Sequence, residues 1–157
     1  MGPPRLPNLI PVGEPFASIC VCVPGYRGQS LAVLSNSCIS NTILVVEDEL
    51  VIRLCIADAL RDAGFEVVEA STADEALTII KGGTPIHLVF TDVRMPGTMD
   101  GIALISLLRK MRPELKLAVA SGYSPDWPSP NLVDAFVGKP YDVARAVNRI
   151  KALLECA

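Results

Sequence analysis

Five short apolar runs alternate with amphipathic helical patterns from Thr42 to the C-terminus. Runs of this length suit strands that are buried on both faces, and a helix between two such strands favours a parallel connection. The alternation therefore predicts an α/β domain in which helices cover both faces of a doubly wound, five-stranded parallel sheet. We expect the strands at 42–46, 66–70, 86–91, 115–120 and 134–138.

Helical periodicity fills the segments between these strands. Apolar residues recur at spacings of three and four, Thr72 begins a capping box, and Gly64 and Gly82 follow helical patterns as C-terminal caps. Cys55 lies on the apolar stripe of the first helix and is expected in the core, and Met111 shares one face of the third helix with Leu104 and Leu108. The four expected helices cover about 52–63, 73–81, 104–111 and 142–155.

The segment between the fourth and fifth strands departs from this alternation. It runs from Tyr123 to Leu132 and holds three prolines within six residues. A proline inside a helix costs about 3 kcal/mol, which rules out a regular helix through this span. We expect a shortened or irregular helix here, with Trp127 either covering exposed core or anchoring a partner.

Length and charge narrow the classes of function. The 157 residues fit one domain with an appendage and leave no room for a second output domain. Net charge is −3, and residues 42–157 carry −4, so direct binding to nucleic acid is disfavoured. The five cysteines are odd in number and lack zinc-site spacing, which indicates reduced thiols in a cytoplasmic protein.

Residues 1–41 form a separate, proline-rich extension. They hold six of the 13 prolines, and their apolar stretch at 17–23 is too short to span a membrane. Prolines and Glu14 also interrupt any signal-peptide core. We expect either a poorly ordered extension or sequence upstream of a native start near Ser40, with the domain itself at 42–157.

Polar side chains follow four of the expected strands. Glu47 and Asp48 end the first strand and Asp92 ends the third, while Ser121 and Lys139 follow the fourth and fifth. The carboxyl ends of parallel strands meet at one edge of the sheet, where open α/β sheets bind ligands. The sequence therefore predicts that three acids, a hydroxyl and an amine gather there.

Carboxylates gathered at one edge need a compensating charge. Two of them about 4 Å apart repel by roughly 4 kcal/mol at an effective dielectric constant of about 20. Lys139 can neutralise one charge, and Mg²⁺, which favours carboxylate, water and phosphate oxygens, can bridge the others. A metal-held carboxylate such as Asp92 is then a natural nucleophile for a phosphoryl group.

In these features residues 42–157 resemble the receiver domain of bacterial two-component response regulators, of the stand-alone single-domain type. The resemblance implies a flavodoxin-like fold with strand order 2-1-3-4-5. The stretches that carry it are Val45–Glu49, Thr91–Gly97, Met99–Gly101, Ala120–Tyr123 and Val137–Tyr141.

The resemblance also implies a role for each site residue. Asp92 would accept a phosphoryl group from a histidine kinase or a phosphotransfer protein. Mg²⁺ would bind to Glu47, Asp48, Asp92 and the backbone carbonyl of Arg94. Ser121 and Lys139 would contact the phosphoryl group. Ser121 and Phe136 would act as switch residues. Signalling would follow by a conformational change or by onward phosphotransfer, to a protein target and not to nucleic acid or a membrane.

Several alternatives stay open at this point. Each motif alone has a structural explanation, because acids favour helix N-termini and Asp and Ser-Gly favour turns; Phe136 can equally be a core residue. A degenerate receiver could serve only as a docking module. An aspartate-nucleophile phosphohydrolase would need an acid where Arg94 stands, and a flavin carrier would need a polar phosphate loop where Glu47 and Asp48 stand.

Overall fold

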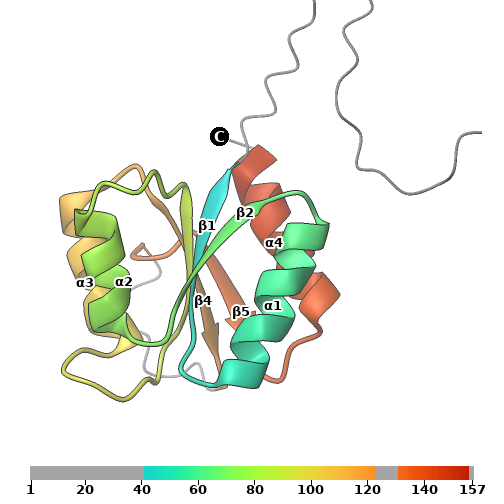
Figure 1. Ribbon diagram of the computed structural model, residues 1–157, viewed down its shortest axis with the longest axis horizontal. Coiled ribbons are helices and arrows are strands. Elements are labelled where there is room, and N and C mark those ends of the chain that lie inside the picture. The colour runs from blue at the N-terminus through green and yellow to red at the C-terminus, as the bar shows by residue number, and fades with distance from the viewer. Residues whose placement is uncertain (1–40, 123–130, 156–157) are drawn as a thin grey trace, which may run out of the picture. The chain divides into compact units, whose positions relative to one another are not determined.

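The computed structural model describes residues 41–122 and 131–155. These residues form five strands and four helices, which alternate as the sequence predicts except that β5 is the next described element after β4 (Figure 1). The strands are β1 (Thr42–Val46), β2 (Glu66–Ala70), β3 (Leu88–Asp92), β4 (Lys116–Ser121) and β5 (Ala135–Gly138). The helices are α1 (Leu50–Asp62), α2 (Ala73–Lys81), α3 (Gly101–Met111) and α4 (Val143–Glu155).

The strands form one sheet in the order β2-β1-β3-β4-β5, and every pair is parallel. This confirms the expected flavodoxin-like order. The register aligns the carboxyl ends of the inner strands, because Val46 pairs with Thr91, and Asp92 pairs with Ala120. Ser121 in turn pairs with Gly138 at the end of β5. The residues that follow these strands therefore share one edge of the sheet.

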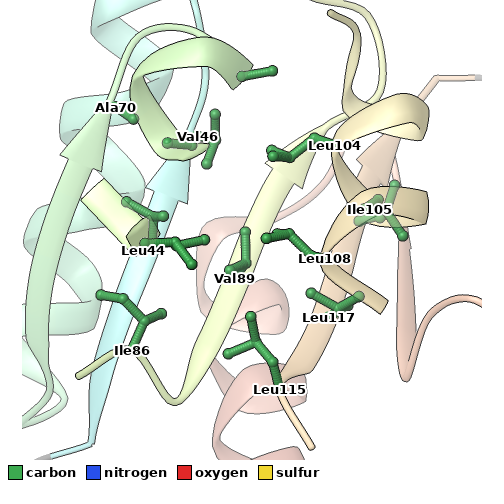
Figure 2. Packing of buried hydrophobic residues seen from close by; sticks show 14 of the residues in the cluster. Leu44, Val46, Ala70, Ile86, Val89, Leu104, Ile105, Leu108, Leu115 and Leu117 are labelled. Carbon is green, nitrogen blue, oxygen red and sulfur yellow. The ribbon is translucent and has the colours of Figure 1, made fainter. Parts of the chain in front are cut away.

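Helices cover both faces of the sheet. Figure 1 shows α2 and α3 on one side and α1 and α4 on the other. Alternate side chains of β1 serve the two sides, because Leu44 and Val46 pack with α2 and α3 while Ile43 and Val45 pack with α1 and α4. Figure 2 shows the first of these cores, in which Val89 lies between Leu44 and Leu108. Burial on both faces explains why the strands read as continuous apolar runs.

The helix ends use the capping signals found in the sequence. Thr72 accepts a hydrogen bond from the backbone N–H of Glu75 at 3.1 Å and begins α2. After α1, the N–H of Gly64 bonds to Arg61 and the N–H of Phe65 bonds to Leu60, which is a Schellman arrangement. Gly64 has φ +92°, a left-handed conformation that glycine adopts without strain.

One residue predicted in the core is not buried, and one residue on an apolar helix face is exposed. Cys55 on α1 is an exposed free thiol, and Met111 at the end of α3 is 44 % exposed. The buried residues of α1 are Ile56, Ala57 and Leu60, so the buried face is turned around the helix axis towards Ala57 and away from Cys55. The prediction for Cys55 failed because the spacing of apolar residues identifies an apolar stripe but does not fix which side of a wide stripe meets the sheet.

Arg109 on α3 anchors the chain where it enters β5. Its guanidinium donates to the carbonyl oxygens of Leu132 and Leu115 and lies 2.7 Å from the Asp134 carboxylate. The same carboxylate accepts the backbone N–H of Leu117 on β4 at 2.8 Å. One side chain therefore ties α3, β4 and the start of β5 together.

Some expectations concern residues outside the described ranges. They include the whole extension at 1–40 and most of the proline-rich span with Trp127; at its end, residues 131–134 lead into β5 without a helix. The extension and its boundary at residue 41 stay predictions. Within the described ranges, each helix is too short or too polar to cross a bilayer.

We expect Arg109→Met to lower the free energy of unfolding by about 2–4 kcal/mol, because several hydrogen bonds to a charged donor are lost together and Asp134 loses its counter-charge. Urea unfolding of the full chain would measure this. Arg112→Met is the matched control, since among the described residues the Arg112 side chain pairs with Glu114 near the surface. Equal losses for the two variants would contradict the role of Arg109.

Candidate functional site

The residues predicted to form a site do lie at one edge of the sheet. Glu47 and Asp48 follow β1, Asp92 ends β3, Ser121 ends β4 and Lys139 follows β5. Parallel pairing brings these positions together across four strands, although they are up to 92 residues apart in the sequence.

Lys139 joins two of the three acids. Its ammonium donates to Glu47 Oε2 at 2.9 Å and to Asp92 Oδ2 at 2.8 Å. The carboxylates are poorly exposed, with side-chain exposures of 5 % for Glu47 and 13 % for Asp92. Water therefore screens this ion pair less than it would at the surface, and both carboxylates depend on the lysine for their charge balance.

The other oxygen of Asp92 is bonded to the backbone. Oδ1 accepts the N–H of Val93 at 2.6 Å, with the N–H of Arg94 at 3.4 Å. The backbone itself is held at the same point, because the N–H of Val93 donates to Ala120 on β4. These contacts fix the orientation of the carboxylate while leaving lone pairs on both oxygens for a further ligand.

The acids also form a cluster that suits a cation. Oxygens of Glu47, Asp48 and Asp92 all lie within 4.8 Å of one another. Glu47 is buried, Asp92 is half-buried and Asp48 is exposed, so the cluster opens to solvent on the Asp48 side. An all-carboxylate set with open positions for water and phosphate oxygens fits Mg²⁺. The carbonyl of Arg94 as a fourth ligand stays a prediction.

Burial and charge act differently on the two ends of the ion pair. Burial raises the pKa of Glu47 above its usual value, although the hydrogen bond and charge of Lys139 oppose this. Burial alone would lower the pKa of Lys139, but the bonds and charges of Asp92 and Glu47 outweigh it and hold the pKa above its usual range. Both pKa values are raised, but for different reasons. Burial dominates for Glu47, whereas two opposite charges outweigh burial for Lys139. Lys139 therefore remains an ammonium at neutral pH.

Ser121 and Phe136 lie on neighbouring strands beside this cluster. Ser121 is 7 % exposed at the end of β4, and its carbonyl accepts the N–H of Lys139 at 2.7 Å. Phe136 on β5 is 38 % exposed, so it is not a buried core residue. The structure therefore excludes the buried-core alternative for Phe136, and its role in switching stays a prediction.

Gly101, at the start of α3, has a role that the sequence did not indicate. A Cβ atom built there would overlap the carbonyl oxygen of Asp92 and lie 2.9 Å from its carbonyl carbon. The N–H of Gly101 donates to Val93 at 3.0 Å. Only glycine lets α3 approach the backbone of Asp92 so closely. The Asp100-Gly101 pair was the available signal, but it looks like an ordinary helix start.

Tyr141 was also missed as a supporting residue. Its ring packs edge-on against Phe90 of β3, with ring centres 6.1 Å apart. Its hydroxyl is buried and has no hydrogen-bond partner among the described residues, and burial raises its pKa to about 12. Because Tyr141 follows Lys139 by two residues, this packing fixes the segment that presents the ammonium.

The fold and site together define a parallel α/β domain with an acidic, cation-suited site at the carboxyl edge of its sheet. Comparison with known proteins identifies the family. The family described as "Response regulator receiver domain" matches residues 43–151. The chain therefore belongs to the receiver-domain family.

Particular relatives agree with this assignment. The chain is 39 % identical over 121 residues to the sensor kinase CckA of Brucella abortus, which covers 74 % of this chain and 13 % of the kinase. It is 34 % identical to the transcriptional regulatory protein PrrA of Mycobacterium bovis, across 73 % of this chain and 50 % of that protein. The chain thus spans at most half the length of these relatives.

Solved structures show the same fold. The receiver domain of NtrX from Brucella abortus has a TM-score of 0.66 and 33 % identity, covering 73 % of this chain and 99 % of that one. The response regulator TrrA from Thermotoga maritima, solved in complex with Mg²⁺ and BeF, has a TM-score of 0.65 and 29 % identity, covering 72 % and 98 %.

We expect Gly101→Ala to lower the free energy of unfolding by about 1–3 kcal/mol, because the added methyl forces the backbone of Asp92 and the start of α3 apart. Urea unfolding would measure the loss. Gly122→Ala is the control at the same edge, since the nearest described atom to its added Cβ would be Lys139 Cβ, at 4.0 Å. A Gly101 variant as stable as the Gly122 variant would contradict the close approach.

Proposed function

We propose that this receiver domain accepts a phosphoryl group on Asp92 in a Mg²⁺-dependent reaction. The observation that carries the proposal is the position of the Lys139 ammonium, within hydrogen-bond distance of both Glu47 and Asp92, while Asp48 adds a third carboxylate. An ammonium and an acid cluster around one oriented carboxylate suit the binding of a dianionic phosphoryl group with a divalent cation.

In the proposed reaction an oxygen of Asp92 attacks the phosphorus atom of the donor. A new oxygen–phosphorus bond forms, the bond from phosphorus to the donor atom breaks, and the product is an acyl phosphate. Lys139 would then turn from the carboxylate towards the added charge, and the hydroxyl of Ser121 would donate to a phosphoryl oxygen. Glu47, Asp48, Asp92 and the carbonyl of Arg94 would hold Mg²⁺, which neutralises charge on the phosphoryl oxygens when bound.

The similarity to TrrA supports this choice of cation, since that protein was solved with Mg²⁺ and BeF. We further propose that the chain catalyses only its own phosphorylation and dephosphorylation. The signal would pass on through a change involving Ser121 and Phe136, or by transfer of the phosphoryl group to another protein. We expect these steps to occur in the cytoplasm.

We propose a histidine kinase or a histidine phosphotransfer protein as the donor. Among the described residues five large apolar side chains are exposed, and three of them, Leu50, Val51 and Leu54, lie at the start of α1. This end of α1 follows directly after Glu47 and Asp48. A pocket of about 590 Å³ continues the apolar surface from Val51 and Ile52 to Lys139. Clustered exposed apolar residues mark protein interaction sites, and a donor bound here would reach Asp92.

Intact mass spectrometry with a small acyl-phosphate donor tests the central proposal. With Mg²⁺ we expect the full chain to gain the mass of one phosphoryl group, and we expect no gain for Asp92→Asn or after removal of Mg²⁺ with a chelator. No gain in a folded protein that binds Mg²⁺ would refute phosphoryl acceptance and favour a docking module that keeps the site without using it.

A second experiment tests the docking surface. Val51 is 67 % exposed, so Val51→Glu should fold normally but place a charge in the apolar patch. We expect transfer from a phosphorylated histidine protein of the natural source to slow by about tenfold or more, while the rate with the small donor stays within about twofold.

Met111→Glu is the control for this experiment, since Met111 is also exposed but lies at the far end of α3. Equal rates of protein-mediated transfer for the two variants would place the donor elsewhere on the surface.

A further inference from the structure

Arg53 on α1 makes a contact that the proposed reaction does not explain. Its Nη1 donates to the backbone carbonyl oxygen of Glu47 at 2.7 Å, and its Nε lies 3.5 Å from the Glu69 carboxylate. The side chain is only 15 % exposed. A cation in the first turns of a helix is disfavoured by the helix dipole, so the position needs compensating contacts.

The start of α1 lacks the side-chain N-cap that begins α2 and α3. Thr72 and Asp100 cap α2 and α3 with side-chain hydrogen bonds, whereas Glu49 at the N-cap of α1 makes none. The backbone N–H of Glu47 donates to the carbonyl of Ala70 on β2 at 3.1 Å. The backbone carbonyl of Glu47 accepts the hydrogen bond from Arg53.

This carbonyl belongs to the peptide that joins Glu47 to Asp48. The orientation of that peptide decides how the two side chains are placed relative to each other, because they leave from its two ends. Both carboxylates belong to the cluster that also contains Asp92. Fixing the peptide therefore fixes two of the three acidic groups against the third.

We propose that Arg53 is a positioning residue for the acidic site: through the Glu47 carbonyl it sets the relative placement of the Glu47 and Asp48 carboxylates and so strengthens Mg²⁺ binding. The inference rests on the proposed Mg²⁺-dependent function. Supporting contacts behind a metal ligand commonly change affinity by about 10–100-fold when removed.

The charge of Arg53 acts in the opposite direction. A guanidinium near the acid cluster repels a divalent cation, so by charge alone its removal would tighten Mg²⁺ binding. The Glu69 carboxylate partly offsets this charge. The same carboxylate also pairs with Arg61, whose Nη2 lies 2.7 Å from Glu69 Oε1. The sign of the change in affinity therefore separates positioning from simple electrostatics.

Arg61 provides a matched control. It lies on the same helix, pairs with the same glutamate and carries the same charge, but no bond joins it to Glu47. We expect Arg53→Met to weaken the Kd for Mg²⁺ about tenfold, measured by calorimetry on the unphosphorylated full chain. Arg61→Met should leave the Kd unchanged or slightly tighter.

Arg53→Lys extends the test if the methionine variant folds poorly. Lysine keeps the charge, but its ammonium cannot bind the Glu47 carbonyl and the Glu69 carboxylate together as the planar guanidinium does. Mg²⁺ binding by this variant should therefore also be weaker than that of the unaltered protein. Thermal unfolding without Mg²⁺ checks that each variant is folded.

Two results are distinguishable. If the unaltered protein binds Mg²⁺ and the folded Arg53 variants bind it as tightly as Arg61→Met, the positioning role is overturned while the proposed function stands. If the unaltered, folded protein shows no Mg²⁺ binding, the proposed function fails as well.

Discussion

The candidate site depends on one ammonium group that balances two poorly hydrated carboxylates. Glu47 and Asp92 leave neighbouring strands, and without Lys139 their repulsion would amount to several kcal/mol. Lys139 follows β5, so it reaches the acids across the end of β4, where its own N–H bonds to Ser121. The two ion pairs of Lys139 therefore form only when β1, β3, β4 and β5 are all in place.

Much of the fold follows from the sequence because parallel, doubly covered strands leave a distinct pattern. β1 and β2 have the predicted limits, since a change from apolar to acidic or polar residues marks their ends. β3 begins two residues later than expected: Ile86 is buried like a strand residue, but regular pairing with β1 starts at Leu88. The convergence of Asp48, Asp92 and Lys139 was predictable as well, because the topology dictates it.

Other features depend on contacts that periodicity does not encode. The bond from Arg53 to the Glu47 carbonyl joins a side chain to a backbone atom six residues earlier, and Gly101 is required by the approach of one helix to one carbonyl. The exposure of Cys55 depends on how α1 is rotated about its axis, since Ala57 is buried on the face that meets the sheet. Such details follow from the packing of elements whose spacing and rotation the sequence pattern leaves free.

The exposed apolar residues of α1 lie at the same edge as the acids, so one end of the molecule combines the proposed chemistry with the proposed docking surface. This arrangement matches the general rule that ligands bind beyond the carboxyl ends of parallel strands.

The contacts of Arg109 have a consequence for how the chain can change over time. Its guanidinium holds the carbonyl of Leu132 and the carboxylate of Asp134, so α3 is joined directly to the entry of β5. The same carboxylate holds the backbone of Leu117 on β4. A substitution that shifts α3 would therefore also shift the strand that leads to Lys139, although Arg109 lies far from that lysine in the sequence.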